Sequence, residues 1–220
     1  MRFRDRADAG RALADELQQY RGRDDVVVLA LPRGGVPVGY ELARRLDAPL
    51  DVFLVRKLGV PGHEELAMGA IASGGVRVLN ESVVAELGIT DDEIARAAVV
   101  AGRELERREH LYRDGRAPVD VARRTVILVD DGLATGASMR AAVIAVRERR
   151  PEKVVVAVPV AAERTCRELG AEVDEIVCAL TPEPFFAVGT WYDDFAQTTD
   201  EEVRELLVRS GGSAPAEARR

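Results

Sequence analysis

Short apolar runs that alternate with helix-length segments constrain the fold of this chain more than any other feature. Residues 25–31 (DVVVLAL) are almost entirely apolar and rich in β-branched side chains, as in a strand buried on both faces. A helical pattern follows at 36–46, and the alternation then recurs along the chain. Strands separated by helices form βαβ units, so we expect an α/β fold with a mostly parallel sheet flanked by helices. Strands are predicted at 25–31, 50–55, 125–129, 153–160 and 175–180.

The segments between these strands complete the outline. Thr90 and Glu93 form a capping box at the start of a long helix that ends near Arg113. Residues 56–65 combine charge, glycine and proline without periodicity and are predicted to form a loop, and 181–198 is expected to be irregular. We also expect a hairpin at 68–72 and 76–79, helices at 137–149, 161–169 and 200–208, one domain over 1–210 and a disordered tail at 211–220.

The stretch VILVDDGLATGAS, residues 126–138, carries the clearest chemistry. Ligands of parallel sheets bind at the carboxyl ends of the strands, where Asp130 and Asp131 would stand. Successive backbone N–H groups in the small-residue loop, at the start of a helix, form a cradle for an anion such as a phosphate monoester. Carboxylates instead accept hydrogen bonds from hydroxyls or bind a divalent cation. A phosphate close to a diol describes a ribose 5-phosphate.

This stretch also has other interpretations. The DDG sequence is compatible with a plain turn before a helix, without a ligand. A Walker A loop ends in Gly-Lys-Ser/Thr, which does not occur here. A receiver domain can begin with a similar run, but this pair lies past the middle of the chain and leads into a glycine loop. Phosphatases of the Asp-x-Asp type have acids one residue apart, whereas Asp130 and Asp131 are adjacent.

The whole stretch resembles the phosphoribosyl-pyrophosphate (PRPP) signature of type I phosphoribosyltransferases: an apolar strand, two acids, two variable residues and a small-Thr-Gly-x-Thr/Ser loop. The resemblance implies the type I phosphoribosyltransferase fold, with a C-terminal hood over about 181–198 and extra helices. It implies that Asp130 and Asp131 hold the ribose hydroxyls. The loop that would bind the 5-phosphate consists of Ala134, Thr135, Gly136, Ala137 and Ser138.

A second strand end, LPRGGVP at 31–37, resembles the pyrophosphate loop of the same family, which often holds a strained or cis peptide bond. Arg33 can pair with phosphate oxygens, and the two glycines free the backbone for an unusual conformation. A strand-to-helix turn with an exposed arginine is the alternative. The resemblance implies that Arg33, Gly34 and Lys57 contact pyrophosphate.

The third strand end resembles the mobile loop that closes over the reaction in this family, here about 56–67. Arg56 and Lys57 would act in catalysis by neutralising charge on the departing pyrophosphate. Closure would also exclude water from an oxocarbenium-like centre. His63, Glu64 and Glu65 are candidates for proton transfer, and a solvated charged loop is the alternative.

The fourth strand end, PFFAVGTWYDDF at 184–195, is rich in aromatic residues. Packing beneath a long connection explains some of them. The segment also resembles the hood of hypoxanthine-type members, in which an aromatic ring stacks on the purine. By position, the base would lie against Phe186, Val188 and Trp191. Asp193, with Asp130 and Asp131, would help to hold magnesium.

The sequence departs from the family pattern, and it therefore does not identify the base. Hypoxanthine-type members carry an aspartate just before the Thr-Gly pair, where this chain has Ala134 and resembles adenine-type members. In its whole pattern the chain is similar to uncharacterised bacterial and archaeal members. The resemblance accounts neither for the helix at 90–113 nor for the helix at the N-terminus.

Charge and composition limit which partners and which cellular compartment we expect. The formal net charge of −7 argues against nucleic-acid binding, because phosphate contacts need a basic face. No apolar run approaches the ~20 residues that span a bilayer. The charged start MRFRDRADAG shows no secretory signal, so we expect a cytoplasmic protein without a membrane contact. Cys166 and Cys178 are expected as two buried thiols rather than a disulfide.

The resemblance implies transfer of the 5-phosphoribosyl group of PRPP to a nitrogenous, purine-like base, with release of pyrophosphate. The expected cofactor is Mg2+, and the expected partners are PRPP, the base and a second copy of the chain in a homodimer. A non-catalytic sensor of PRPP or of a nucleotide is the first alternative. A phosphohydrolase acting on a ribose phosphate is the second.

Overall fold

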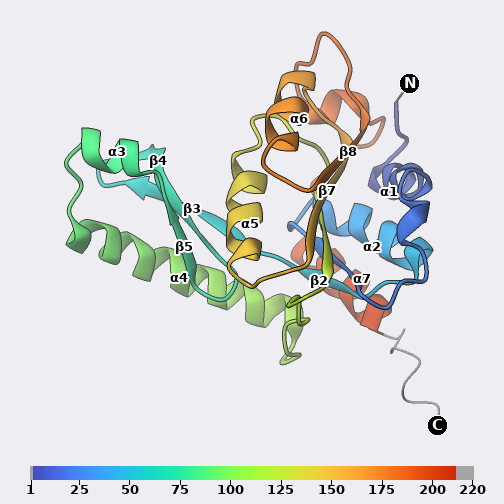
Figure 1. Ribbon diagram of the computed structural model, residues 1–220, viewed down its shortest axis with the longest axis horizontal. Helices are drawn as coiled ribbons and strands as arrows, with labels where there is room; N and C mark the ends of the chain where they lie inside the picture. Colours follow the sequence, from blue (N-terminus) through green and yellow to red (C-terminus); the bar gives the residue numbers. More distant parts are fainter. Residues whose placement is uncertain (1, 212–220) are drawn as a thin grey trace.

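A five-stranded parallel sheet lies at the centre of the computed structural model, which describes residues 2–211 (Figure 1). The spatial order of its strands is β2-β1-β6-β7-β8, and every neighbouring pair is parallel. The predicted α/β fold is confirmed, and each predicted strand of this sheet is present. The strands are β1 (Val26–Ala30), β2 (Leu50–Val52), β6 (Thr125–Val129), β7 (Lys153–Val160) and β8 (Glu175–Leu180).

Helices cover both faces of this sheet. They are α1 (Arg6–Asp15), α2 (Gly35–Leu46), α5 (Ala137–Arg147), α6 (Glu163–Gly170) and α7 (Asp200–Gly211), with a short 3-10 helix η1 (Gln18–Tyr20) after α1. Successive strand residues point to opposite faces, so Val28 packs with α1, α2 and α7, whereas Leu29 packs with α5 and α6. This double cover explains why the strands read as continuous apolar runs. Because α7 includes Gly211, most of the tail predicted at 211–220 lies outside the described residues.

The segment 56–65 belongs to a second, antiparallel sheet, so the prediction of a loop is wrong. The strands of this sheet are β3 (Val55–Val60), β4 (His63–Ala72) and β5 (Val76–Leu79), in the order β3-β4-β5. The chain turns between β3 and β4 at Gly62, whose φ is 78°. Leu58 and Val60 are buried while Arg56 and Lys57 are exposed. The buried apolar residues stabilise the strand, and the exposed charged residues at its start mask it in the sequence. The hairpin of β4 and β5 is confirmed.

Two further helices connect this second sheet to the central one. They are α3 (Glu81–Glu86), which no sequence pattern indicated, and α4 (Asp91–Arg113). The predicted capping box at Thr90 and Glu93 is present. At the other end of α4, the buried Arg113 donates to Asp51 and to the Val52 carbonyl of β2. The second sheet, α3 and the start of α4 project to one side of the central sheet, at the left of Figure 1.

Residues 181–198 contain no strand and only one short 3-10 helix, η2 (Val188–Trp191), as predicted. The N-terminal segment lies against them, because Phe3 and Tyr192 form a parallel bridge. None of the helices within residues 2–211, including α4 with its 23 residues, is long and apolar enough to cross a membrane.

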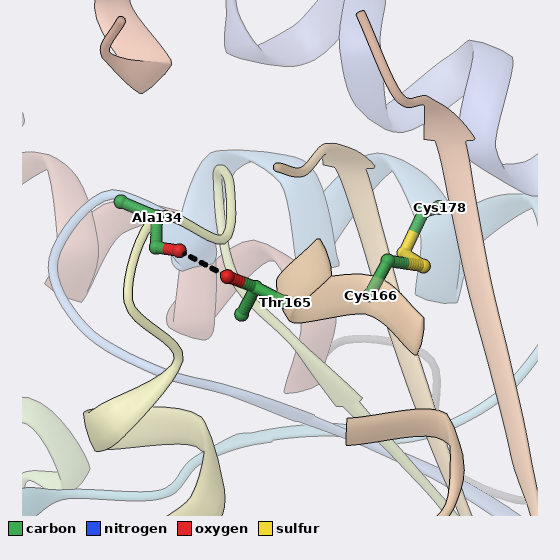
Figure 2. The surroundings of a disulfide bond; sticks show 4 residues. All are labelled: Ala134, Thr165, Cys166 and Cys178. Carbon is green, nitrogen blue, oxygen red and sulfur yellow. Dashed lines mark hydrogen bonds between the residues drawn. A yellow bond between two sulfur atoms is a disulfide. The ribbon is translucent and has the colours of Figure 1, made fainter. Parts of the chain in front are cut away.

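The prediction of two free thiols is also wrong, because Cys166 of α6 and Cys178 of β8 form a disulfide (Figure 2). Helix α6 packs on β8 and brings the two Cα atoms to 6.7 Å, within the range that a disulfide spans. The sequence offered only the spacing of the two residues, and not the packing that joins them.

Candidate active site

The loops after β1 and β6 meet at the point where the strand order reverses. Strand β1 lies between β2 and β6 in the sheet. From β1 the chain passes through α2 to β2, on one side of β1, and it later returns to β6, on the other side of β1. In open α/β sheets this arrangement opens a crevice outside the carboxyl ends of the two strands. The Leu31 N–H donates to the Val129 carbonyl at 2.8 Å, which ties the two loops together.

The glycines of the first loop allow this close approach. A Cβ built on Gly34 would overlap the Asp131 carboxylate, and one built on Gly35 would lie 2.7 Å from the Val129 carbonyl oxygen. These contacts place Gly34 directly against the acid pair. The Pro32–Arg33 peptide bond is cis, the feature that the resemblance implies for this loop.

The two acids are held close together in partly buried positions. The Asp131 N–H donates to Asp130 Oδ1 at 2.9 Å. Burial raises the pKa of the Asp130 carboxyl well above its ordinary value, and the neighbouring charge of Asp131 adds to the increase. Burial also raises the pKa of the Asp131 carboxyl, although a hydrogen bond from Arg6 opposes the increase. The site therefore holds acceptor oxygens in a low-dielectric position, where a hydroxyl or a cation would stabilise them.

Arg6, which the sequence did not indicate, is the cation beside this pair. Its Nε donates to Asp131 Oδ2 at 2.8 Å, and its Nη1 donates to the Ala196 carbonyl at 2.7 Å. The guanidinium carbon lies 3.9 Å from the centre of the Phe195 ring. No local pattern could reveal this contact, because Arg6 and Asp131 are separated by 125 positions.

The loop before α5 has the geometry of an anion cradle. Gly136 is the N-cap of α5 and has a φ of 75°. Among the hydrogen bonds within residues 2–211, none has the backbone N–H of Ala134, Thr135 or Gly136 as its donor. The Thr165 hydroxyl of α6 donates to the Ala134 carbonyl at 2.7 Å and so holds the loop in place (Figure 2). Ala137 and Ser138 begin the helix and are exposed. These N–H groups can bind a phosphate.

Arg33 lies in the first loop, and Arg56 lies beside it. Arg33 Nη1 is 3.8 Å from Asp200 Oδ1, and Arg56 Nη1 is 3.9 Å from Glu104 Oε1 of α4. Lys57 follows Arg56 in β3, and so points to the opposite face of the sheet. One small pocket adjoins Pro32 and Arg56, and its lining is Pro32, Leu54, Val55, Arg56, Glu104, Leu105 and Arg108. Helix α4, which the resemblance does not explain, therefore borders the 31–37 loop.

The candidates for proton transfer are placed differently. His63 is exposed and pairs with Val60 at the tip of the hairpin, at the far end of β3 from Arg56. The side chains of Glu64 and Glu65 are outside the described part of the structure.

The hood contacts the acid loop through two residues. The Tyr192 hydroxyl donates to the Asp131 carbonyl at 2.6 Å, and burial raises the pKa of this tyrosine. Val188 packs so closely on Gly132 that a Cβ on the glycine would overlap it. Tyr192 was not among the predicted site residues.

The other hood candidates make no hydrogen bond or ion pair with the acids within residues 2–211. Phe186 is 81% exposed, which leaves its ring available to stack on a ligand. Trp191 is half-buried, and its Nε1 is buried without a hydrogen-bond partner in the described structure. The Asp193 side chain is 60% exposed and lies 3.8 Å from Arg2.

The sequence of the chain matches a known family. The family model described as "Phosphoribosyl transferase domain" matches residues 3–194. A Mycobacterium tuberculosis protein provisionally named a phosphoribosyl transferase is 49% identical over 210 residues, which are 94% of this chain and 47% of that protein. The chain thus spans about half the length of these curated relatives. The bifunctional protein PyrR of Chloroflexus aurantiacus is 32% identical over 148 residues, 64% of this chain and 72% of that protein.

The fold also matches a solved structure. The crystal structure of the protein TT1426 from Thermus thermophilus has a TM-score of 0.84 to this chain at 45% sequence identity. The match covers 95% of this chain and 99% of that one. It therefore includes the second sheet and α4 as well as the central sheet.

Proposed function

This chain belongs to the phosphoribosyl transferase domain family, and from that premise we propose that it transfers the 5-phosphoribosyl group of PRPP to a nitrogenous base. The observation that carries the proposal is the meeting of three groups at one crevice. These groups are the acid pair of Asp130 and Asp131, the open N–H groups of 134–136, and the Arg33–Gly34 loop. They match the diol, the 5-phosphate and the pyrophosphate of PRPP.

The proposed reaction exchanges one bond at C1 of the ribose for another. A base nitrogen forms the new bond to C1 as the bond from C1 to the pyrophosphate oxygen breaks, and the base loses its proton to solvent or to a nearby acceptor. The transition state resembles an oxocarbenium ion, so the protein contributes positioning and charge stabilisation. Asp130 and Asp131 orient the ribose, and Arg33 and Arg56 stabilise charge on pyrophosphate. A purine-like base would lie against Phe186, Val188 and Trp191.

The donor set suits a magnesium ion that arrives with the substrate. Within residues 2–211 no group of three His, Cys, Asp or Glu side chains is arranged to hold a metal ion. Mg2+ commonly binds one or two carboxylates and completes its shell with water and substrate phosphates. Asp130 and Asp131 fit this role, and Asp193 is the third candidate. When bound, the ion would neutralise charge on pyrophosphate.

A panel of bases tests the proposal. The protein is mixed with Mg2+, PRPP and each common purine or pyrimidine base, and nucleotide and pyrophosphate are quantified by chromatography. We expect product with at least one base, and none with Asp130→Asn/Asp131→Asn. Failure of every base to give nucleotide would refute the proposed transfer.

One observation favours a second candidate, a non-catalytic sensor of PRPP or a nucleotide. Arg56 and Lys57 lie in the paired strand β3 rather than in a loop, and Arg56 is paired with Glu104. The double variant Arg56→Ala/Lys57→Ala distinguishes the two functions. It should abolish turnover by a transferase, but barely change the binding of a 5-phosphate by a sensor.

A further inference from the structure

We propose that Arg6 is a positioning residue of the ribose half of the site. It holds the Asp131 carboxylate in the orientation that accepts a hydrogen bond from a ribose hydroxyl. This inference rests on the proposed function, since it assumes that a ribose phosphate occupies the crevice. Arg6 acts through Asp131 and does not itself contact the sugar.

The first support is the placement of the guanidinium. The Arg6 and Asp131 side chains are only 12% and 16% exposed. Arg6 uses separate nitrogen atoms for Asp131 and for the Ala196 carbonyl, and it lies over the Phe195 ring. A Cβ built on Gly34 would be 3.3 Å from Arg6 Nε. The Arg6 side chain thus contacts both the hood and Asp131, and it lies beside the 31–37 loop.

The second support is that the backbone holds Arg6 in place before any ligand binds. The Asp5 side chain caps α1 by accepting from the Asp8 N–H at 2.7 Å. The Phe3 N–H donates to the Trp191 carbonyl at 2.9 Å, and the Asp194 N–H donates to the Arg4 carbonyl at 2.8 Å. The segment that carries Arg6 is therefore fixed to the hood on its N-terminal side and to a capped helix on the other.

The third support is the oxygen that Arg6 leaves open. Arg6 binds only Oδ2 of Asp131, and no hydrogen bond in the described structure reaches Oδ1. A charge-assisted hydrogen bond to one oxygen holds that oxygen in place and restrains rotation of the carboxylate. The second oxygen then has a defined direction in which it can accept a hydroxyl. Without Arg6, the carboxylate would be free to rotate, and its repulsion from Asp130 would be uncompensated.

Two ligands that differ only in the diol test this role. 1,4-Anhydroribitol 5-phosphate carries the ring, the phosphate and both ring hydroxyls, whereas tetrahydrofurfuryl phosphate lacks the hydroxyls. Calorimetric titration measures both against the wild-type chain, Arg6→Gln and Arg6→Lys. The matched control is Arg4→Gln, because Arg4 lies in the same segment but is 73% exposed and pairs only with Asp8.

Arg6→Gln should weaken binding of the diol ligand about tenfold, the usual effect of losing one charge-assisted hydrogen bond. It should change binding of tetrahydrofurfuryl phosphate less than about twofold. Arg6→Lys should be intermediate for the diol ligand, because one ammonium group cannot replace both donors of the fork. Arg4→Gln should match the wild-type chain for both ligands.

An equal loss for both ligands would overturn the inference, since it would mean that Arg6 only supports the hood. A melting curve verifies that each variant is folded, and if Arg6→Gln does not fold, Arg6→Lys carries the comparison alone. If the wild-type chain binds neither ligand, the proposed function fails, and the role of Arg6 fails with it. If the wild-type chain binds both ligands equally, the diol makes no contact and the role of Arg6 alone is refuted.

Discussion

At the scale of single residues, the acid pair shows a conflict between stability and function. Asp130 and Asp131 are adjacent like charges in a partly buried crevice, and burial raises the pKa of both carboxyls. Arg6 compensates the charge of Asp131 through a 2.8 Å hydrogen bond, but within residues 2–211 the Asp130 carboxylate accepts a hydrogen bond only from the Asp131 N–H. A ribose diol and a cation would satisfy the remaining acceptors. Without ligand, Asp130 therefore destabilises the folded chain at neutral pH.

Asp130→Asn should accordingly stabilise the ligand-free protein while it weakens PRPP binding. We expect the free energy of unfolding at pH 7 to rise by on the order of 1 kcal/mol. The carboxyl ionises near its ordinary pKa of 3.8 in the unfolded chain but only at higher pH in the folded one. Wild-type stability therefore falls as the pH rises above that value, and the asparagine variant escapes this loss. Urea unfolding at pH 3 and at pH 7, without Mg2+, measures the difference.

A stabilising effect of equal size at both pH values would contradict this account of Asp130. A variant that is less stable at pH 7 than the wild-type chain would contradict it too.

Position 34 needs a glycine because there is no room for a side chain, and not because of its backbone angles. Its φ of −61° suits any residue, but a Cβ there would overlap the Asp131 carboxylate. Gly34→Ala should therefore displace the acid and weaken PRPP binding by tenfold or more, as overpacking by one methyl group often costs about 1–3 kcal/mol. Fluorescence or calorimetric titration with PRPP measures the loss.

Gly102→Ala is the matched control for Gly34, because a Cβ there would meet only Ile71 Cδ1, at 3.5 Å. It should bind PRPP like the wild-type chain. Unchanged affinity in Gly34→Ala would mean that the first loop does not need its close approach to Asp131.

The sequence could predict candidate site residues only within short contiguous motifs, and not the contacts between distant segments. Asp130, Asp131 and the loop that follows them form one uninterrupted pattern with a recognisable chemistry. Arg6, Thr165 and Tyr192 reach the same loop from segments that are 125, 31 and 61 positions away from their partners. Such contacts have no periodicity or spacing, so only the folded chain reveals them.

At the scale of elements, the strands of the central sheet could be predicted because burial on both faces makes them uniformly apolar. Strand β3 could not, because it begins with two exposed charged residues, Arg56 and Lys57, which obscure its apolar pattern. Helix α3 is only 6 residues long and has no buried residue, so it leaves no apolar pattern. Helix α4 was predicted from its capping box, but its position beside the 31–37 loop depends on long-range contacts such as that of Glu104 with Arg56.

The disulfide between α6 and β8 should contribute measurably to stability. Cys166 and Cys178 are 12 positions apart, and closing a loop of about this length restricts the unfolded chain by ~3 kcal/mol. The double variant Cys166→Ala/Cys178→Ala should lose roughly 2–3 kcal/mol in guanidinium unfolding. Wild-type protein in excess dithiothreitol should show the same loss, and protein without reductant should not. Equal stability with and without reductant would show that the two thiols are not joined.

At the scale of the whole molecule, the crevice is assembled from both ends of the described chain. The N-terminal segment pairs with the hood at Phe3 and Tyr192. The hood reaches the acid loop through Val188 and through the hydroxyl of Tyr192. Helix α4 joins the second sheet to β2 through Arg113 and borders the 31–37 loop. The added elements therefore surround the crevice.

The compartment and the assembly remain predictions at this scale. A disulfide is uncommon in reducing compartments, so the cytoplasmic location needs a direct test by fractionation. The homodimer is tested by light scattering at several protein concentrations.

The most direct test of the central claim is a 31P NMR time course of PRPP with Mg2+ and the accepted base. The proposed transfer predicts that nucleotide and free pyrophosphate appear in equal amounts, and that neither forms without the base. It also predicts that Asp130→Asn/Asp131→Asn leaves the PRPP signals unchanged. Release of phosphate or pyrophosphate without a base would indicate hydrolysis, and PRPP that binds but stays intact with every base would indicate a sensor. Either result would contradict the transferase account.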